Sequence, residues 1–318
     1  MDQRPLNVVS SMLAGRILRQ ACNGDELHIT AFPEKSTPPF FVLQPGGLRA
    51  LEVLGIEVPH GISIKKTTIR DRSKNVIVEY DFQRLLGGAC PMIFEGQEFI
   101  GSMYSQMPTV SQLDASVGRV VQDSFPAPGI RIRVYKGTLH NVHEHILYVM
   151  GTEYVGMAQM NDQSFFYYAI SSKRDNERDA TSRAMDECME MNAERGALLL
   201  DTWVPLSTIA LYDTSDEFDM AWGSARLALH PFTGQHISFF ACEALRYKRA
   251  MSAGMSAEKC AREFAIRSKS FYDIHKRVMR FYVDQTFSWR VARMLYPLIL
   301  RHSHLIRERA IRRITLLN

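Results

Sequence analysis

The first part of the chain alternates between short apolar runs and amphipathic stretches. Residues 6–9 (LNVV) and 27–32 (LHITAF) are rich in β-branched and apolar side chains and predict strands, whereas residues 13–22 between them predict a helix. The turn signal Asn23-Gly24-Asp25 separates this helix from the second strand. The pattern therefore predicts a βαβ unit.

A second amphipathic helix is predicted within QPGGLRALEVLGI. It places Leu48, Leu51 and Leu54 on one side and meets a stop at Gly55. A β-rich middle follows, in which four short runs predict an antiparallel sheet: IRIRVYKG, HEHILYVMG, YVGMAQM and SFFYYAISS. The rest is predicted to be helical, with helices over residues 176–195, 237–253 and 256–282. The expected fold class is mixed α/β.

Composition narrows the class of protein. The 318 residues are 46% hydrophobic and 10% aromatic, as in an ordinary globular protein. The net charge is only +4, and seven arginines lie from Arg290 onward, so the rest of the chain is slightly acidic and nucleic acid is not expected as a partner. Without a signal peptide or an apolar run of about 20 residues, we expect a cytoplasmic protein. The five scattered cysteines predict reduced core thiols.

Two stretches carry part of a cofactor-binding pattern. Phosphate loops of dinucleotide folds use glycines for a tight turn and for close approach of backbone N–H groups. At the first strand-to-helix junction the chain reads Ser-Ser-Met-Leu-Ala-Gly over residues 10–15. Residues 223–238, GSARLALHPFTGQHIS, place a glycine, a proline and a Gly-Gln pair at a characteristic spacing, at Gly223, Pro231, Gly234 and Gln235.

These stretches resemble FAD-dependent monooxygenases of the aromatic-ring hydroxylase type. LNVVSSMLAGRIL is similar to their opening, which carries GxGxxG, but only Gly15 matches it. The later stretch is similar to their Gly-Asp and Pro-x-x-Gly-Gln-Gly motif, with Ser224 in place of the aspartate and His236 in place of the last glycine. Weaker similarities extend over most of the chain. The span between Phe32 and Asp114 is short for this family, which indicates a trimmed nucleotide domain.

The resemblance implies a Rossmann-like βαβ domain, an antiparallel substrate domain and a C-terminal helical region. The expected boundaries are residues 1–115 and 200–255 for a degenerate FAD-binding-like domain, 116–199 for the β-rich substrate domain and 256–318 for the C-terminal helices.

The departures from the family motifs predict that FAD is not retained. Ser10 and Met12 are expected to put side chains where the pyrophosphate needs bare backbone. Ser224 offers a shorter, uncharged group than aspartate, and His236 places an imidazole where glycine lets the flavin ring approach. The degenerate motif positions, from which no cofactor binding is expected, are Ser10, Met12, Gly15, Ser224, Gly234 and Gln235.

The leading functional hypothesis is therefore a cofactor-independent isomerase or cyclase that acts on an apolar or aromatic biosynthetic intermediate. One alternative is a working FAD-dependent monooxygenase that uses NADPH. The other is a noncatalytic binding or partner subunit.

Candidate site residues come from LHNVHEHILY and from the later motif. On a strand, His143 and His145 share one face, and Glu144 and Tyr148 share the other. The expected catalytic residues are His143, Glu144 and His236, and the expected substrate-binding residues are His145, Tyr148, Tyr168 and His230. The alternative is that these are surface or strand-edge groups. The His-x-x-His-x-His spacing suggests a metal, but no further ligand is evident, so no metal is expected.

The basic stretch RVARMLYPLILRHSHLIRERAIRRITLL sets arginines opposite apolar residues at helical spacing. Such a helix can contact an anionic membrane surface, form a dimer face or simply cover the domain.

Overall fold

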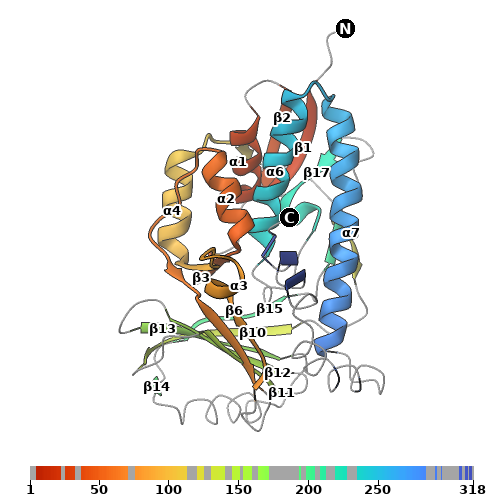
Figure 1. The fold of residues 1–318 in the computed structure, drawn as a ribbon. Helices are drawn as coiled ribbons and strands as arrows, with labels where there is room; N and C mark the ends of the chain where they lie inside the picture. Colours follow the sequence, from red (N-terminus) through yellow and green to blue (C-terminus); the bar gives the residue numbers. More distant parts are fainter. Residues whose placement is uncertain are drawn as a thin grey trace.

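The computed structural model describes the backbone of most of the chain. The residues described are 5–22, 26–32, 37–70, 76–112, 120–124, 130–139, 145–150, 153–159, 164–171, 193–194, 198–204, 208–212, 219–227, 235–283, 291, 295, 308–309, 312–313 and 315–316. Figure 1 shows helices packed around a parallel sheet in the upper part and a broad antiparallel sheet below them.

A four-stranded parallel sheet forms the centre of the upper part. Its strand order is β17-β1-β2-β8, and β1 (Leu6–Ser11) pairs with both β2 (Leu27–Phe32) and β17 (Met220–Ala221). The edge strand β8 spans Ser111–Gln112. Because both faces of a parallel sheet are covered, β1 is almost continuously buried. Helix α1 (Met12–Ala21) connects β1 to β2, which confirms the predicted βαβ unit.

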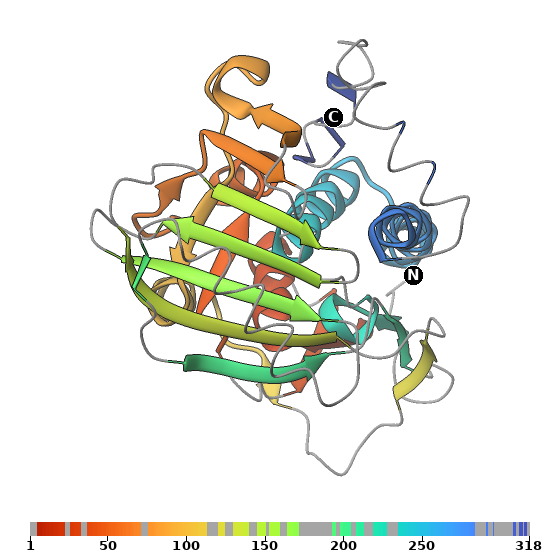
Figure 2. The same cartoon turned by 90° about the horizontal axis from the view of Figure 1, so that it is seen from below.

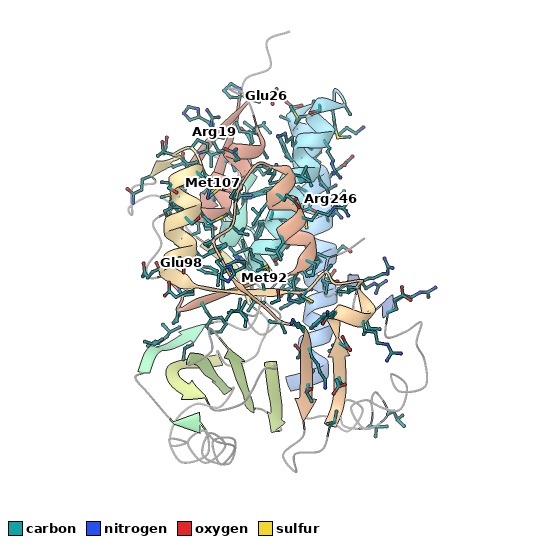
Figure 3. All side chains as sticks on the ribbon, turned by 60° about the vertical axis from the view of Figure 1, so that its left-hand side comes forward. Arg19, Glu26, Met92, Glu98, Met107 and Arg246 are labelled. Atoms are coloured by element: carbon teal, nitrogen blue, oxygen red, sulfur yellow. The ribbon has the colours of Figure 1, made fainter. Side chains whose placement is uncertain are left out.

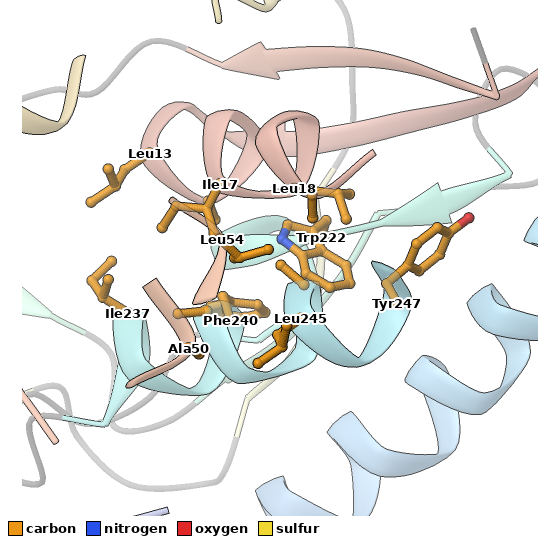
Figure 4. Close-up of a cluster of buried hydrophobic side chains, with 14 of the residues drawn as sticks. Leu13, Ile17, Leu18, Ala50, Leu54, Trp222, Ile237, Phe240, Leu245 and Tyr247 are labelled. Carbon is orange, nitrogen blue, oxygen red and sulfur yellow. The ribbon is translucent and has the colours of Figure 1, made fainter. Parts of the chain in front are cut away.

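Three more helices pack with α1 around one core. They are α2 (Pro45–Val53), α4 (Gly96–Gln106) and α6 (His236–Ser252). Apolar side chains of α1, α2 and α6 meet around the fully buried Trp222, as Figure 4 shows. Figure 3 draws the described side chains as sticks and labels Met107, which follows the end of α4 and is part of the core. The helices are therefore held by one shared apolar cluster.

A small antiparallel sheet lies between the helices and the large sheet. Its order is β3-β7-β4, formed by Phe40–Leu43, Met92–Glu95 and Ile62–Ser63. The short helix α3 (Phe82–Leu85) begins at Asp81, whose carboxylate accepts a hydrogen bond from the Arg84 backbone N–H. None of these elements was predicted from the sequence.

The large sheet has eight strands in the order β14-β10-β13-β12-β11-β5-β6, with β15 also paired to β10. Figure 2 shows it from below, with α7 seen end-on beside it. All neighbours are antiparallel except β11 and β5, which are parallel. The bounds are β5 Lys66–Arg70, β6 Val76–Asp81, β10 Ile130–Leu139, β11 His145–Met150, β12 Glu153–Gln159, β13 Ser164–Ser171, β14 Ala193–Glu194 and β15 Leu198–Val204. Strands β9 (Val120–Ser124) and β16 (Thr208–Tyr212) form a separate antiparallel pair.

The four strands predicted in the middle of the chain are β10 to β13, which confirms the antiparallel sheet. Two contributions to this sheet were not predicted. Strands β5 and β6 come from residues 1–115, which were expected to belong to the FAD-binding-like domain. All but the first two residues of β15 come from residues 200–255, which were assigned to the same domain. The predicted helix over residues 176–195 does not reach its expected end, because Ala193–Glu194 form β14. Its preceding residues lie outside the described part of the chain.

Helix α7 (Ala257–Val283) runs along one side of the molecule (Figure 1). It is anchored to α6 through Glu243, a residue that is 1% exposed. The Glu243 carboxylate pairs with Arg246 of α6 and, at 2.8 Å, with the Nε atom of Arg267 of α7. The helices predicted over 237–253 and 256–282 are confirmed to within one residue at each end.

Replacing Arg267 by glutamine is expected to lower the free energy of unfolding by roughly 1–3 kcal/mol. The change removes one of the two cations that face a buried carboxylate. Urea denaturation would measure the loss. Arg262→Gln, at an exposed position of the same helix, is the control and should change stability by about 0.5 kcal/mol or less. Equal effects of the two variants would contradict a buried ion pair between α6 and α7.

None of the helices in the described part of the chain is both long enough and apolar enough to cross a membrane. Four of the five cysteines lie in that part, and all four are free thiols: Cys22, Cys90, Cys242 and Cys260.

Candidate functional site

The carboxyl ends of β1 and β17 meet at one edge of the parallel sheet. Val9 of β1 is in register with Ala221 of β17, and helix α1 starts directly after Ser11. The chain leaves β17 through Trp222 and enters the short helix η1 (Gly223–Ala225). In open α/β sheets, ligands bind at this edge, at the starts of the helices that follow the strands. Both sequence motifs therefore converge on a position suited to a ligand.

The two serines at the end of β1 are turned into the protein. Ser10 is fully buried, and its hydroxyl donates to the Ser11 carbonyl at 2.9 Å. A Cβ atom added to Gly15 would lie 3.2 Å from the Ser10 Cβ, so the Ser10 side chain lies against helix α1. The Ser11 hydroxyl accepts a hydrogen bond from the Ser224 backbone N–H at 3.2 Å. Neither hydroxyl is directed outward over the start of α1.

Gly223 lies where the two motifs contact each other, against Ser11 and Ala14. Its φ of 60° lies in the left-handed region, which favours glycine. A Cβ atom at this position would collide with the Ser11 hydroxyl oxygen and lie 2.6 Å from the Ala14 Cβ. Glycine is therefore required both for the backbone conformation and for the close approach to the β1–α1 junction.

Ser224 and His236 interact directly. The His236 Nε2 atom lies 3.1 Å from the Leu227 carbonyl oxygen and 3.3 Å from the Ser224 hydroxyl oxygen. A carbonyl only accepts, so Nε2 carries the hydrogen and donates to both oxygens. Burial lowers the pKa of His236 to about 4, against the opposing effect of the hydrogen bond to Leu227, so the ring is neutral at pH 7.

In this tautomer Nε2 cannot take the Ser224 proton, so the two residues are not a serine–histidine pair for nucleophilic attack. The hydroxyl hydrogen of Ser224 is instead available to a second acceptor.

The starts of α2 and α6 lie against each other near this edge. The backbone N–H of Gln44, just before α2, donates to the Ser238 hydroxyl of α6 at 2.8 Å. A Cβ atom at Gly47 would lie 2.5 Å from the Ser238 Cα, so the two helices are in close backbone contact. Among the described residues, α1, α2 and α6 have no side-chain cap at their starts and no acidic residue in their first turns. The starts of α1, α2 and α6 are thus positive helix ends that suit an anionic group, although the Gly46 N–H of α2 already donates to the Thr315 carbonyl at 2.9 Å.

The other predicted site residues are placed only in part. His145 is the first residue of β11 and is in register with Thr67 of β5. Tyr148 of β11 is paired with Val155 of β12, whereas Tyr168 of β13 is paired with the next residue of β12, Gly156. The two tyrosines therefore lie in neighbouring rows of paired residues across the sheet. Gln235 is buried directly before α6. The remaining predicted positions, His143, Glu144, His230 and Gly234, lie outside the described residues.

The structure thus gathers Ser10, Gly15, Ser224, Gln235 and His236 along one edge, together with Met12 at the start of α1. Ser11 and Ser238 also belong to this edge and were not predicted from the sequence. Their role depends on hydrogen bonds to residues 213 and 194 positions away, which no local pattern reveals.

No family model and no curated protein matches the sequence. Solved structures do match the fold over nearly the whole chain. HpxO of Klebsiella pneumoniae, solved with FAD and uric acid, is 12% identical, with a TM-score of 0.66 over 98% of this chain and 97% of that chain. The p-nitrophenol 4-monooxygenase PnpA of Pseudomonas putida DLL-E4 is 10% identical, with a TM-score of 0.66 over 99% and 97%. PqsL of Pseudomonas aeruginosa, in complex with 2-aminobenzoylacetate, is 11% identical, with a TM-score of 0.60 over 98% and 99%.

The prediction that this chain uses no cofactor is therefore wrong, because similar structures are FAD-bound monooxygenases. Its physical premise is also revised. Ser10, which was expected to obstruct the pyrophosphate, turns inward against Gly15. The match over 97% of the HpxO chain does not show the trimming expected between Phe32 and Asp114. The chain has the fold of FAD-dependent monooxygenases.

Proposed function

We propose that this protein is an FAD-dependent monooxygenase that acts on a small aromatic or apolar molecule. One observation carries the proposal: the starts of α1, α2 and α6, which among the described residues have no side-chain cap and no acidic residue in their first turns, lie close to the edge where β1 and β17 end. The fold shared with HpxO and PnpA supports it. The cofactor-independent hypothesis is not carried forward.

The residues at this edge fit an anionic dinucleotide. Backbone N–H groups in the first turn of α1 would face the diphosphate, with the positive end of the helix dipole toward it. Gly15 keeps α1 close to the sheet, since an added Cβ would lie 3.2 Å from the Ile29 Cγ2. The Ser224 hydroxyl, which accepts from His236, would donate to a hydroxyl oxygen of the cofactor. Bound FAD would supply electron transfer from NADPH to dioxygen.

The chain's own residues orient this site and exclude water from it. The Trp222 and Phe264 rings pack in a tilted arrangement with their centroids 4.1 Å apart, and the His236 and Phe240 rings form an edge-to-face pair with centroids 5.0 Å apart. Burial lowers the pKa of His236, so its imidazole is neutral, and its Nε2 atom lies 3.3 Å from the Ser224 hydroxyl. We propose that the substrate lies against the large sheet, where Tyr148, Tyr168 and His145 remain the candidates for contact, with His230 in the neighbouring motif. His143 and Glu144 remain candidates for moving a proton.

The absorption spectrum of the freshly purified protein tests the proposal. We expect flavin bands, retention of FAD in equilibrium dialysis and substrate-dependent consumption of NADPH and dioxygen. A protein that neither carries nor retains FAD, yet still converts its substrate, would contradict the monooxygenase assignment.

Replacing Met12 by glutamate should affect the helix and the cofactor in opposite directions. Met12 is half-buried at the first position of α1, where a carboxylate stabilises the positive helix end by about 0.3–1 kcal/mol. The same charge repels a diphosphate, so we expect FAD affinity to fall roughly tenfold or more. Met12→Gln has the same length without the charge and is the matched control. If Glu and Gln bind FAD equally well in dialysis, the diphosphate does not lie at this helix start.

A further inference from the structure

Residues 223–227 form a short turn that carries two groups of the cofactor edge. The backbone N–H groups of Arg226 and Leu227 both donate to the carbonyl of the glycine that begins the turn, at 3.0 Å. Ser224 lies within the turn, and the Leu227 carbonyl accepts from His236. A single helical turn is marginal on its own, because few hydrogen bonds offset the ordering of its backbone. The position of Ser224 therefore depends on contacts that hold the turn from outside.

Arg226 connects this turn to helix α7. Its Nε atom donates to the Ser268 hydroxyl at 3.1 Å, and one terminal nitrogen donates to the Ala265 carbonyl at 3.3 Å. The Ser268 hydroxyl donates to the same Ala265 carbonyl at 3.0 Å, so the two acceptors are fixed relative to each other. A guanidinium presents such a pair of N–H groups in a rigid fork, which a lysine ammonium cannot reproduce. The contact is therefore specific to arginine.

The part of α7 that meets the turn is firmly anchored. Ser268 is buried, and the buried Phe264 packs against Trp222, the residue directly before the turn. Next to Ser268, Arg267 pairs with the buried Glu243 of α6. Helix α7 therefore gives the turn a fixed support.

The contact of Arg226 is unusual because it includes no acid. Among the residues that the structure describes, no carboxylate pairs with this guanidinium, and both of its acceptors are neutral oxygens. The side chain is half-buried, and desolvation by burial lowers its pKa. A buried charge without a counter-ion costs stability, and an apolar side chain of similar volume in its place is often neutral or stabilising. The stability of the fold therefore gives no reason for an arginine at this position.

We propose that Arg226 is a positioning residue for the cofactor, which fixes Ser224 by connecting the 223–227 turn to α7. This inference rests on the proposed function, in which the Ser224 hydroxyl donates to FAD. In this role the guanidinium acts through its two acceptors on α7, so its effect requires the fork and not the charge alone.

Arg226→Met tests this role, because stability and FAD affinity should not fall together. Methionine has a similar length and no charge, so urea denaturation should give an unchanged or higher free energy of unfolding. FAD affinity in equilibrium dialysis should fall roughly tenfold, since a charge-assisted contact that orders Ser224 is lost. Arg226→Lys keeps the charge without the fork, and we expect the same loss of FAD affinity. Arg262→Met, at an exposed position of α7, is the control and should change neither quantity.

Three outcomes would overturn the positioning role. Full FAD affinity in Arg226→Met would do so and leave the FAD assignment intact. Full affinity in Arg226→Lys, with a loss in Arg226→Met, would assign the effect to the charge and not to the fork. A parallel loss of stability and affinity in Arg226→Met would show an ordinary structural contact.

Hydrogen exchange tests the same contact in the absence of FAD. In Arg226→Met the amides of Ser224 and Leu227 should exchange faster than in the natural chain, whereas the amide of Phe239, within α6, should keep its protection. Unchanged exchange in the turn would overturn its connection to α7. If the exchange result holds but no chain retains FAD, the proposed function fails, and the role of Arg226 in cofactor binding fails with it.

Discussion

Acidification from about pH 6.5 to pH 4 is expected to destabilise the protein through His275. This residue of α7 is 3% exposed. Burial, with a further contribution from the nearby His236, lowers its pKa to about 4. In the unfolded chain histidine titrates near 6.5, so between these values the unfolded state binds more protons and unfolding becomes more favourable as the pH falls. The loss is about 1.4 kcal/mol per pH unit, on the order of 3 kcal/mol in total.

His236 adds to this effect, but to a smaller extent. Its pKa is also lowered to about 4, yet the residue is only half-buried, and partial access to water reduces the cost of charging the ring. Above pH 7 neither histidine should contribute to the pH dependence of stability, because both are neutral in the folded and unfolded states.

Urea denaturation at several pH values would measure the effect of His275. In His275→Gln the slope of unfolding free energy against pH should become shallower by about 1.4 kcal/mol per unit between pH 6.5 and 4. His60→Gln, at an exposed position, should keep the slope of the natural chain. Carboxylates titrate in all three proteins, so the comparison isolates the histidine. An unchanged slope in His275→Gln would show that His275 is accessible to protons in the folded state.

Gly223→Ala should strongly destabilise the protein at the cofactor edge. The left-handed conformation costs alanine about 1–2 kcal/mol, and the collision with Ser11 and Ala14 adds roughly 1–3 kcal/mol. Because Ser224 follows directly and is bonded to Ser11, its shift should also weaken FAD binding.

Gly254→Ala is the matched control for this variant. Gly254 has a φ of 82° and would find nothing within 4 Å of an added Cβ, so only the conformational cost applies. Thermal or urea unfolding should give a larger loss for Gly223→Ala, with FAD affinity reduced in that variant alone. Equal losses would mean that the β1–α1 junction yields to the added methyl group without cost.

Much of the fold could be predicted because its main elements are long and periodic. The βαβ opening, the strands β10 to β13 and the helices α6 and α7 each carry enough residues to show a period of two or 3.6. Strands of two residues, such as β4, β8 and β17, carry too few residues for any period. The parallel pairing of β5 with β11 depends on a contact between distant segments that neither segment's pattern encodes.

The described parts of the two motifs lie at one sheet edge, but the direction of the Ser10 side chain differs from the prediction. The distances in sequence from Gly223 to Gln235 and from Ser10 to Gly15 placed both motifs at one sheet edge. The direction of the Ser10 side chain could not be predicted, because it depends on how β1 packs against α1, where Ser10 lies beside Gly15. A serine in a glycine position was therefore taken as an obstruction, although its hydroxyl turns toward a partner inside the fold.

The pairing of β1 with β17 also bears on how the protein is made. On the flank of β1 that faces away from β2, Val8 and Val9 find their partners only at Met220 and Ala221. During synthesis on the ribosome, β1 therefore leaves the exit tunnel long before β17. Until β17 is made, this edge of β1 has no strand to pair with. The amino-terminal half therefore cannot complete its sheet while the rest of the chain is still being translated. Until then, aggregation or chaperone binding at the open edge of β1 competes with productive folding.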